Sequence, residues 1–324
     1  MNRRHFALSS LISAWPLQGL AQPAQPWPER PIKWVLSQPA GSGPDNVARI
    51  LADRLAKTWG QAVVIDNKPG GQNTIGALAA ARSPADGHHF YFATTAALVT
   101  NPLLFKTLPY DPAKDFVPVA FIARSAFAVL VRSESPLTNI DELVARSKAT
   151  PGRFSLGNEG PRTFSGMIAR LLNTRTQAGA NLVPYANVGV GTQDLLGGHV
   201  DAMVADLAST AALARQGKLR VLATTAARRV PGWDAVPALA EKLPGFDMVG
   251  WFVVMAPAGT PAAVIARANR DINELLNDKD VAERIAAIGP LVDGSLATEG
   301  LASFLRAELL RWQDVVREIG VLPE

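Results

Sequence analysis

The sequence predicts an α/β protein of two domains built on mainly parallel sheets. Its 324 residues exceed what one ordinary hydrophobic core accommodates. From residue 31 onward, apolar strand-like runs alternate with segments of helical periodicity. These runs are apolar on both faces, which is typical of parallel strands covered by helices.

Two strand–helix cycles follow each other along the chain. In the first cycle the helix after residue 37 has apolar residues at helical spacing and ends at Gly60. In the second cycle a helix over 139–150 has Thr138 as its possible cap and ends at Pro151. The expected strands are residues 32–37, 62–66, 89–95, 126–132, 153–157, 181–185, 201–206 and 218–225.

Two further runs, residues 116–123 and 251–257, are candidate strands that cross between the domains. Helical stretches over 261–277, 280–288 and 298–319 then return the chain to the first domain. Two crossings make a hinge, and the cleft beside a hinge is the default ligand site. The expected domains are residues 26–124 plus 250–324 for domain one and 125–249 for domain two, after an export signal and spacer at 1–25.

The N-terminus has the pattern of an export signal. Arg3 and Arg4 precede an interrupted apolar region over 6–20, and the sequence around Ala21 offers a small-residue cleavage site. The segment "NRRHFAL" also resembles a twin-arginine signal, although it lacks the usual Ser or Thr before the arginines. The alternative is a disordered cytosolic tail. Export predicts a protein of the periplasm.

Composition excludes several classes of function. The chain has no cysteine, which rules out disulfides, iron–sulfur clusters, thiol catalysis and cysteine-ligated zinc. Its formal net charge is only +4, so nucleic-acid binding is not expected. The adjacent His88 and His89 would point to opposite faces of an extended chain and do not make a metal pair. We expect no metal and no cofactor.

A glycine-rich turn, "LSQPAGSGPDNVARILADRL", lies between the first strand and the first helix. It is not a dinucleotide fingerprint, because Gly41 and Gly43 fit but Asn46 occupies the third position. It lacks the Gly-Lys-Ser/Thr of a P-loop, and Ser42 does not stand in a nucleophile elbow. The remaining interpretation is a turn and helix N-terminus that favour a carboxylate or phosphate.

Asp45 lies where this helix begins. We expect it to cap the helix, to accept a hydrogen bond from the ligand, or to do both. Comparable loops occupy residues 67–77, 93–102, 156–166 and 184–192, and Asp206 ends another strand. Ligands of open α/β sheets bind beyond the carboxyl ends of strands, so these loops should converge on one cleft.

With these loops identified, the chain resembles the periplasmic receptors of tripartite tricarboxylate transporters, also called Bug-type receptors. The resemblance covers about residues 27–321. Its marks are "LPYDPAKDFVPV", "GQAVVIDNKPGG", "VPYANVGVGTQDLLGGHVDAM" and "APAGTPAAVIARANRDINELL". It implies a two-domain, type II Venus flytrap receptor without catalysis that holds a small carboxylate and delivers it to integral membrane permease subunits.

The resemblance also implies which residues bind the ligand. In such receptors backbone groups and ordered waters hold the carboxylate more than arginines do. Carried over by position, the ligand-binding residues are Gln38, Ala40, Gly41, Ser42, Asp45, Thr74, Ile75, Thr94, Thr95, Gly160, Thr163, Ser165, Ala186, Gly189 and Asp206.

Several positions depart from the family pattern. Ser42 replaces a second glycine, and Gln72 and Asn73 replace a Gly-Gly pair. The segment "EGPRTFSG" lacks the usual histidine and contains Arg162. These departures add amide groups and a charge, so the ligand is expected to differ from an ordinary family ligand.

Other functions stay open at this point. A sensor of the same fold would present its ligand state to a membrane partner, and sequence does not separate it from a transport receptor. A periplasmic hydrolase would need Ser42 or Ser165 beside His199 or His88. Trp251, at the start of a crossing strand, is the tryptophan most worth following as a ligand contact. We expect a monomer.

Overall fold

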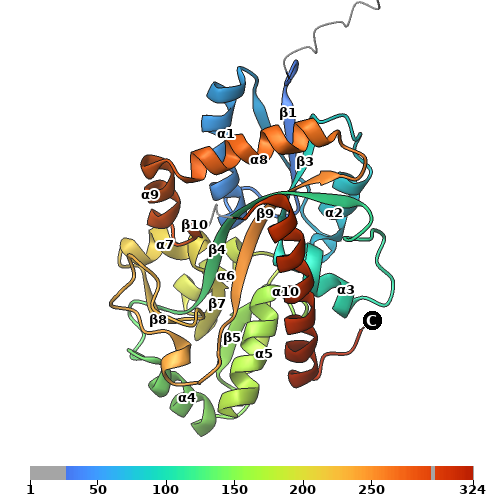
Figure 1. Cartoon of the computed structure of the whole chain (residues 1–324). Helices are drawn as coiled ribbons and strands as arrows, with labels where there is room; N and C mark the ends of the chain where they lie inside the picture. The colour runs from blue at the N-terminus through green and yellow to red at the C-terminus, as the bar shows by residue number, and fades with distance from the viewer. Residues whose placement is uncertain (1–26, 293–295, 324) are drawn as a thin grey trace, which may run out of the picture.

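The computed structural model describes residues 27–292 and 296–323, and the expected export signal at 1–25 lies outside them. The ten strands of these residues form one continuous sheet with the order β2-β1-β3-β9-β4-β7-β5-β6, while β8 and β10 pair with β4. Helices lie on both sides of the sheet (Figure 1). The expected α/β fold class is confirmed.

Three parallel strands build one part of the molecule, called here the β1 half. Its strands are β1 (Ile32–Leu36), β2 (Val63–Asn67) and β3 (His89–Thr94). Its helices are α1 (Gly43–Trp59), α2 (Thr74–Ala81), α3 (Asn101–Leu104), α8 (Ala262–Leu276) and α9 (Lys279–Ala287), with a 3₁₀ turn at Gly71–Asn73 and a π-helical turn at Ala96–Thr100.

A second parallel set builds the β5 half. Its strands are β5 (Ser155–Asn158), β6 (Asn181–Pro184) and β7 (Ala202–Asp206), and β8 (Leu219–Thr224) pairs antiparallel with β4. Its helices are α4 (Ile140–Ala149), α5 (Phe164–Thr176), α6 (Val188–Gly197) and α7 (Leu207–Arg215), with a 3₁₀ turn at Leu239–Glu241.

Two long strands, β4 (Phe116–Arg132) and β9 (Val249–Pro257), connect the halves. The expectation of separate strands at 116–123 and 126–132 is wrong, because β4 is one strand of 17 residues. Arg124 and Ser125 pair with residues of β9 and carry the strand through the junction. Neither residue is a glycine or proline that would interrupt the ladder.

The last helix, α10 (Thr298–Glu318), runs beside the crossing strands and reaches the β5 half (Figure 1). Its Trp312 ring packs 4.9 Å from that of Phe164 at the start of α5. Arg175, at the end of α5, donates to Glu318 at 2.8 Å. The short strand β10 (Leu291–Val292) precedes α10 and pairs with β4.

Each face of the β1 half buries its own hydrophobic core because side chains alternate along the strands. Trp34 and Phe92 pack with α1, α8 and α9 on one face, while Val35 and Tyr91 belong to the core on the other face. This double burial explains the fully apolar strand sequences.

The helix ends differ in part from expectation. Gly60 ends α1 with φ of 66°, as its glycine predicts. The N-cap of α1 is Ser42, so the expected cap at Asp45 is wrong and this residue lies in the first turn. The expected cap at Thr138 is also wrong, because Asn139 accepts the Glu142 N–H instead. Among the described helices, none is long and apolar enough to cross a membrane.

Candidate functional site

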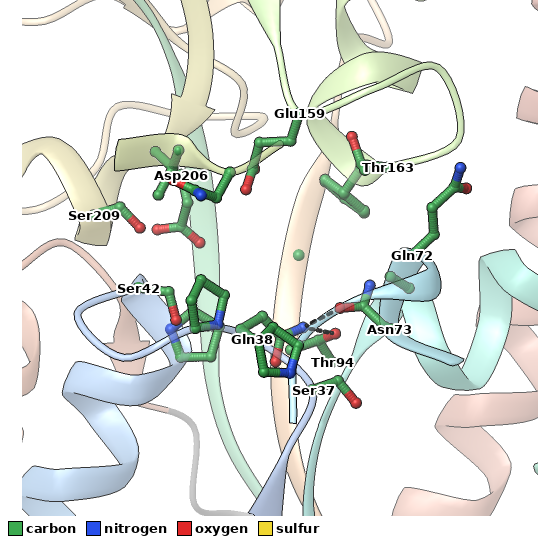
Figure 2. A pocket seen from close by; sticks show the side chains of 18 of the residues that line it. Ser37, Gln38, Ser42, Gln72, Asn73, Thr94, Glu159, Thr163, Asp206 and Ser209 are labelled. Atoms are coloured by element: carbon green, nitrogen blue, oxygen red, sulfur yellow. Dashed lines mark hydrogen bonds between the residues drawn. The ribbon is translucent and has the colours of Figure 1, made fainter. Parts of the chain in front are cut away.

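A cavity of about 460 Å³ lies between the β1 half and the β5 half. The segments after β1, β2 and β3 line it from one side, and those after β5, β6 and β7 line it from the other (Figure 2). It therefore sits beyond the carboxyl ends of six strands, where ligands of open α/β sheets bind.

The structure brings about half of the predicted site residues to the cavity wall. Those that line it are Gln38, Ser42, Thr94, Thr95, Thr163, Ala186 and Asp206. The others belong to the same segments but do not line the cavity: Ala40, Gly41, Asp45, Thr74, Ile75, Gly160, Ser165 and Gly189.

Sequence reasoning missed several lining residues, of which Glu159 matters most. The signal that could have found it is its place directly after β5 and before a Gly-Pro turn. Gln72, Asn73 and Trp251, which the sequence did single out, also line the cavity. Pro39, Pro44, Phe164, Asn187 and Val188, which lie within the turns carried over from the family, line the cavity as well. The other missed residues are Ser37, Pro69, Gly70, Gly71, Ala96, Phe127, Ser209, Gly250 and Phe252.

The glycine turn before α1 uses its backbone N–H groups within the protein. The Gly41 N–H donates to Asp45 at 2.8 Å, and the Gly43 N–H donates to Ser209 Oγ of the β5 half at 2.7 Å. A β-carbon at Gly43 would lie 2.7 Å from Asp206 Oδ1. Glycine at position 43 thus permits a close approach between the halves, and these two amides do not face a ligand.

Asp45 anchors this turn from behind the cavity. Arg49 donates to both of its carboxylate oxygens, at 2.8 and 3.0 Å, and Asn67 Nδ2 donates at 2.9 Å. Burial alone would raise the pKa of Asp45, but the hydrogen bonds from Arg49, Gly41 and Asn67 outweigh it and lower the pKa. The carboxylate is therefore ionised and its charge is already paired with Arg49.

Gln38 joins three segments of the β1 half. Its Nε2 donates to Asn73 Oδ1 and to Thr94 Oγ1, both at 3.0 Å (Figure 2). Its Oε1 is buried without a partner among the described residues, as are Ser42 Oγ and Gln72 Oε1. Buried polar atoms are normally hydrogen-bonded, so these three atoms are positioned to meet a ligand or water.

The β5 half presents an acidic wall. Asp206 is 7% exposed, caps α7 through the Ala208 N–H at 2.7 Å and accepts from Ser125 Oγ at 3.2 Å. Burial, which outweighs these bonds, and the nearby Glu159 raise the pKa of Asp206 to about 7. Burial likewise raises the pKa of Glu159, while Ser165 and the Val188 N–H act in the opposite direction.

The arrangement lacks the geometry of the hydrolase alternative. His88 precedes β3, whose other end reaches the cavity, so a strand of six residues separates them by about 20 Å. His199 likewise lies before β7, at the end opposite Asp206. Ser165 Oγ accepts the Glu159 N–H at 3.0 Å and supports the acidic wall.

Fold and cavity together define a periplasmic binding protein, in which a solute is held between two α/β halves joined by crossing strands. A family model described as the tripartite tricarboxylate transporter family receptor matches residues 47–321. Protein BugT of Bordetella pertussis is 35% identical over 308 residues, covering 93% of this chain and 94% of BugT.

Two solved structures have the same fold over the whole of their chains. A Rhodopseudomonas palustris protein with adipate aligns with a TM-score of 0.88 and 31% identity, covering 92% of this chain and 100% of its own. The periplasmic binding protein BugD aligns with a TM-score of 0.86 and 29% identity, covering 92% and 100%.

The chain belongs to the tripartite tricarboxylate transporter receptor family. It is a solute-binding protein and not an enzyme, and its family is periplasmic.

Proposed function

We propose that the chain captures a small carboxylate in the cavity between its halves and delivers it to integral membrane permease subunits. The observation that carries this proposal is a cavity of about 460 Å³ lined by six strand ends from both halves. This volume falls in the range of about 300–1,000 Å³ for small-molecule sites. Adipate in the R. palustris structure supports a carboxylate ligand.

The proposal includes the domain boundaries and the route to the periplasm. The domains are residues 26–124 plus 250–324 and residues 125–249, and they close about β4 and β9. Residues 1–25 act as the export signal, through either the general or the twin-arginine pathway. The receptor acts as a monomer and needs no cofactor.

A thermal-shift screen of the purified chain tests the ligand class. Organic acids and amino acids are compared with neutral sugars at matched concentration. A ligand at 100 times its dissociation constant stabilises the folded state by about 2.7 kcal/mol, so at least one carboxylate should raise the melting temperature by several degrees. A clear shift with a neutral sugar and none with any carboxylate would contradict the proposal.

Delivery is tested by capture of membrane subunits. The tagged chain, saturated with the best carboxylate of the screen, should retain multispanning permease subunits from detergent-solubilised membranes. The ligand-free chain is the control and should retain less. Retention of a histidine kinase or another signalling protein in place of a permease would instead assign the chain to sensing.

A further inference from the structure

The wall formed by Glu159 and Asp206 places two carboxyl groups at a site where a simple carboxylate ligand needs none. Both side chains point into the cavity from the β5 half (Figure 2). Among the described residues that line the cavity, none is a lysine, arginine or histidine. The nearby Arg49 of α1 is bound through two nitrogens to Asp45, so its charge is compensated there.

The cavity also has buried oxygen atoms that await a hydrogen-bond partner. Ser42 is 5% exposed and its Oγ has no partner among the described residues. The amide oxygens Gln38 Oε1 and Gln72 Oε1 also have no partner among the described residues, and an amide oxygen can only accept a hydrogen bond. Ser42 lies on the side of Asp206 (Figure 2), so its Oγ and the two carboxyl groups favour a ligand that brings N–H donors to this side. Gln38 and Gln72 lie toward α2 instead, and their amide oxygens accept from water there.

Helix N-termini indicate where the ligand's own carboxylate lies. In the β5 half, the side chains of Thr163, Asn187 and Asp206 already cap α5, α6 and α7. In the β1 half, the N-cap residues of α1 and α2, Ser42 and Asn73, make no side-chain cap bond. At α1 the Gly43 N–H already donates to Ser209, whereas the turn before α2 lines the cavity. The positive end of the α2 dipole therefore favours an anion on the side opposite the acidic wall.

We infer that the ligand carries a protonated nitrogen in addition to its carboxylate, and that Glu159 and Asp206 hold this nitrogen. The inference rests on the proposed function of carboxylate capture. The ligand lies across the cavity with its carboxylate toward α2 and its nitrogen toward the β5 half. A ligand with a second carboxylate at the acidic wall would place it beside two carboxyl groups, with no cationic side chain among the described lining residues to balance its charge.

Calorimetric titration of the full chain with matched probes tests which charge the ligand carries at the end that faces Glu159 and Asp206. One series consists of ω-amino carboxylates of three to six carbons, with the dicarboxylate and the unsubstituted monocarboxylate of each length. A second series compares aspartate and glutamate with their 2-hydroxy analogues. In at least one series the amino member should bind ten or more times more tightly than its matched partners.

The variant Glu159→Gln tests whether the carboxylate of Glu159 binds the protonated nitrogen of the ligand. It keeps the size of the side chain and should weaken the best amino probe at least tenfold, while changing the matched probe without nitrogen less than threefold. Glu283→Gln, on an exposed helix face, is the matched control and should bind both probes as the parent chain does. Equal affinity of Glu159→Gln and the parent chain for the amino probe would overturn the inference.

Proton exchange gives a second readout. Because a nearby cation favours ionised carboxylates, the amino probe should release protons on binding near pH 7, measured in buffers of different ionisation enthalpy. Tighter binding of dicarboxylates, with proton uptake, would overturn the inference and leave carboxylate capture standing. Failure of every probe in both series, with binding of neutral sugars, would overturn both proposals.

Discussion

At the scale of single residues, Asp206 performs several roles. Its carboxylate caps α7, accepts from Ser125 on β4 and approaches Gly43 of the β1 half. Its neighbour on the cavity wall, Glu159, contributes to raising the pKa of Asp206. A carboxyl group held in such a buried place favours its neutral form, which links the stability of the fold to pH.

The pH dependence of stability tests this state of Asp206. Because its pKa rises from 3.8 to about 7 on folding, the folded protein binds more protons than the unfolded chain between these values. The free energy of unfolding should therefore fall as pH rises from about 4 to 7, by up to about 1.4 kcal/mol per pH unit for one proton. Asp206→Asn should reduce this slope in urea unfolding measured from pH 5 to 8.

Asp45→Asn is the control for this experiment. The pKa of Asp45 is lowered in the folded state, so its contribution is complete above the unfolded value and is lost only as pH falls below it. This variant should be less stable at every pH from 5 to 8 but keep the parent slope. An unchanged slope in Asp206→Asn would show that its carboxyl group does not titrate as described.

The sequence predicted the segments of the site better than its individual residues. Strand ends and glycine turns locate segments, because sheet geometry fixes where parallel strands end. They do not determine which side chain faces inward: Ser165 turns to the Glu159 N–H, whereas Thr163 lines the cavity. Nor do they show that Ser209 Oγ accepts a hydrogen bond from the Gly43 N–H, because the two residues are 166 positions apart in the chain.

At the scale of elements, α10 joins the two halves. The sequence predicted a helix over 298–319, and its apolar residues Leu301, Trp312 and Val316 are buried. Periodicity shows that a helix has a buried face but not what the face packs against. Only the structure reveals that α10 contacts both β4 and α5.

Trp312 should be a main contributor to this packing. Its side chain is fully buried against Phe164, so Trp312→Ala should lower the free energy of unfolding by about 3–5 kcal/mol. Leu310→Ala, two residues away and 64% exposed in the parent chain, should change it by less than about 0.5 kcal/mol. Urea denaturation checks both, and equal effects would argue against the packing of α10 described above.

At the scale of the whole molecule, α1 and α7 bring the two halves into close contact. The Gly43 N–H donates to Ser209 Oγ at 2.7 Å, and a β-carbon at Gly43 would lie 3.0 Å from that of Ala208. Such distances leave no room for a larger residue at position 43. The contact between the halves thus has a steric requirement as well as a hydrogen bond.

Gly43→Ala should hold the halves apart. We expect a larger radius of gyration by X-ray scattering and at least tenfold weaker binding of the best carboxylate from the screen. Ser209→Ala removes one hydrogen bond, worth about 0.5–1.5 kcal/mol, without adding bulk, and should have a smaller effect. If Gly43→Ala keeps the parent radius and affinity, the contact between α1 and α7 does not limit closure.

The general architecture could be predicted from the sequence, but the way the halves are joined could not. Alternating strands and helices indicated two α/β units and two crossings. The continuity of β4 escaped notice because a strand of 17 residues is far longer than usual, so its apolar run was divided in two. Its partners on β9 lie more than a hundred residues later in the chain.

The unbroken strand β4 also limits how such a receptor can be re-engineered. Its residues belong to the cores of both halves, with Phe121 beside α10 and Val129 beside β7 and β8. A gene fragment that ends within it would deprive each piece of a central strand and expose unpaired edges, which promote aggregation. Recombination between relatives should therefore exchange the turns around the cavity and leave the shared sheet intact.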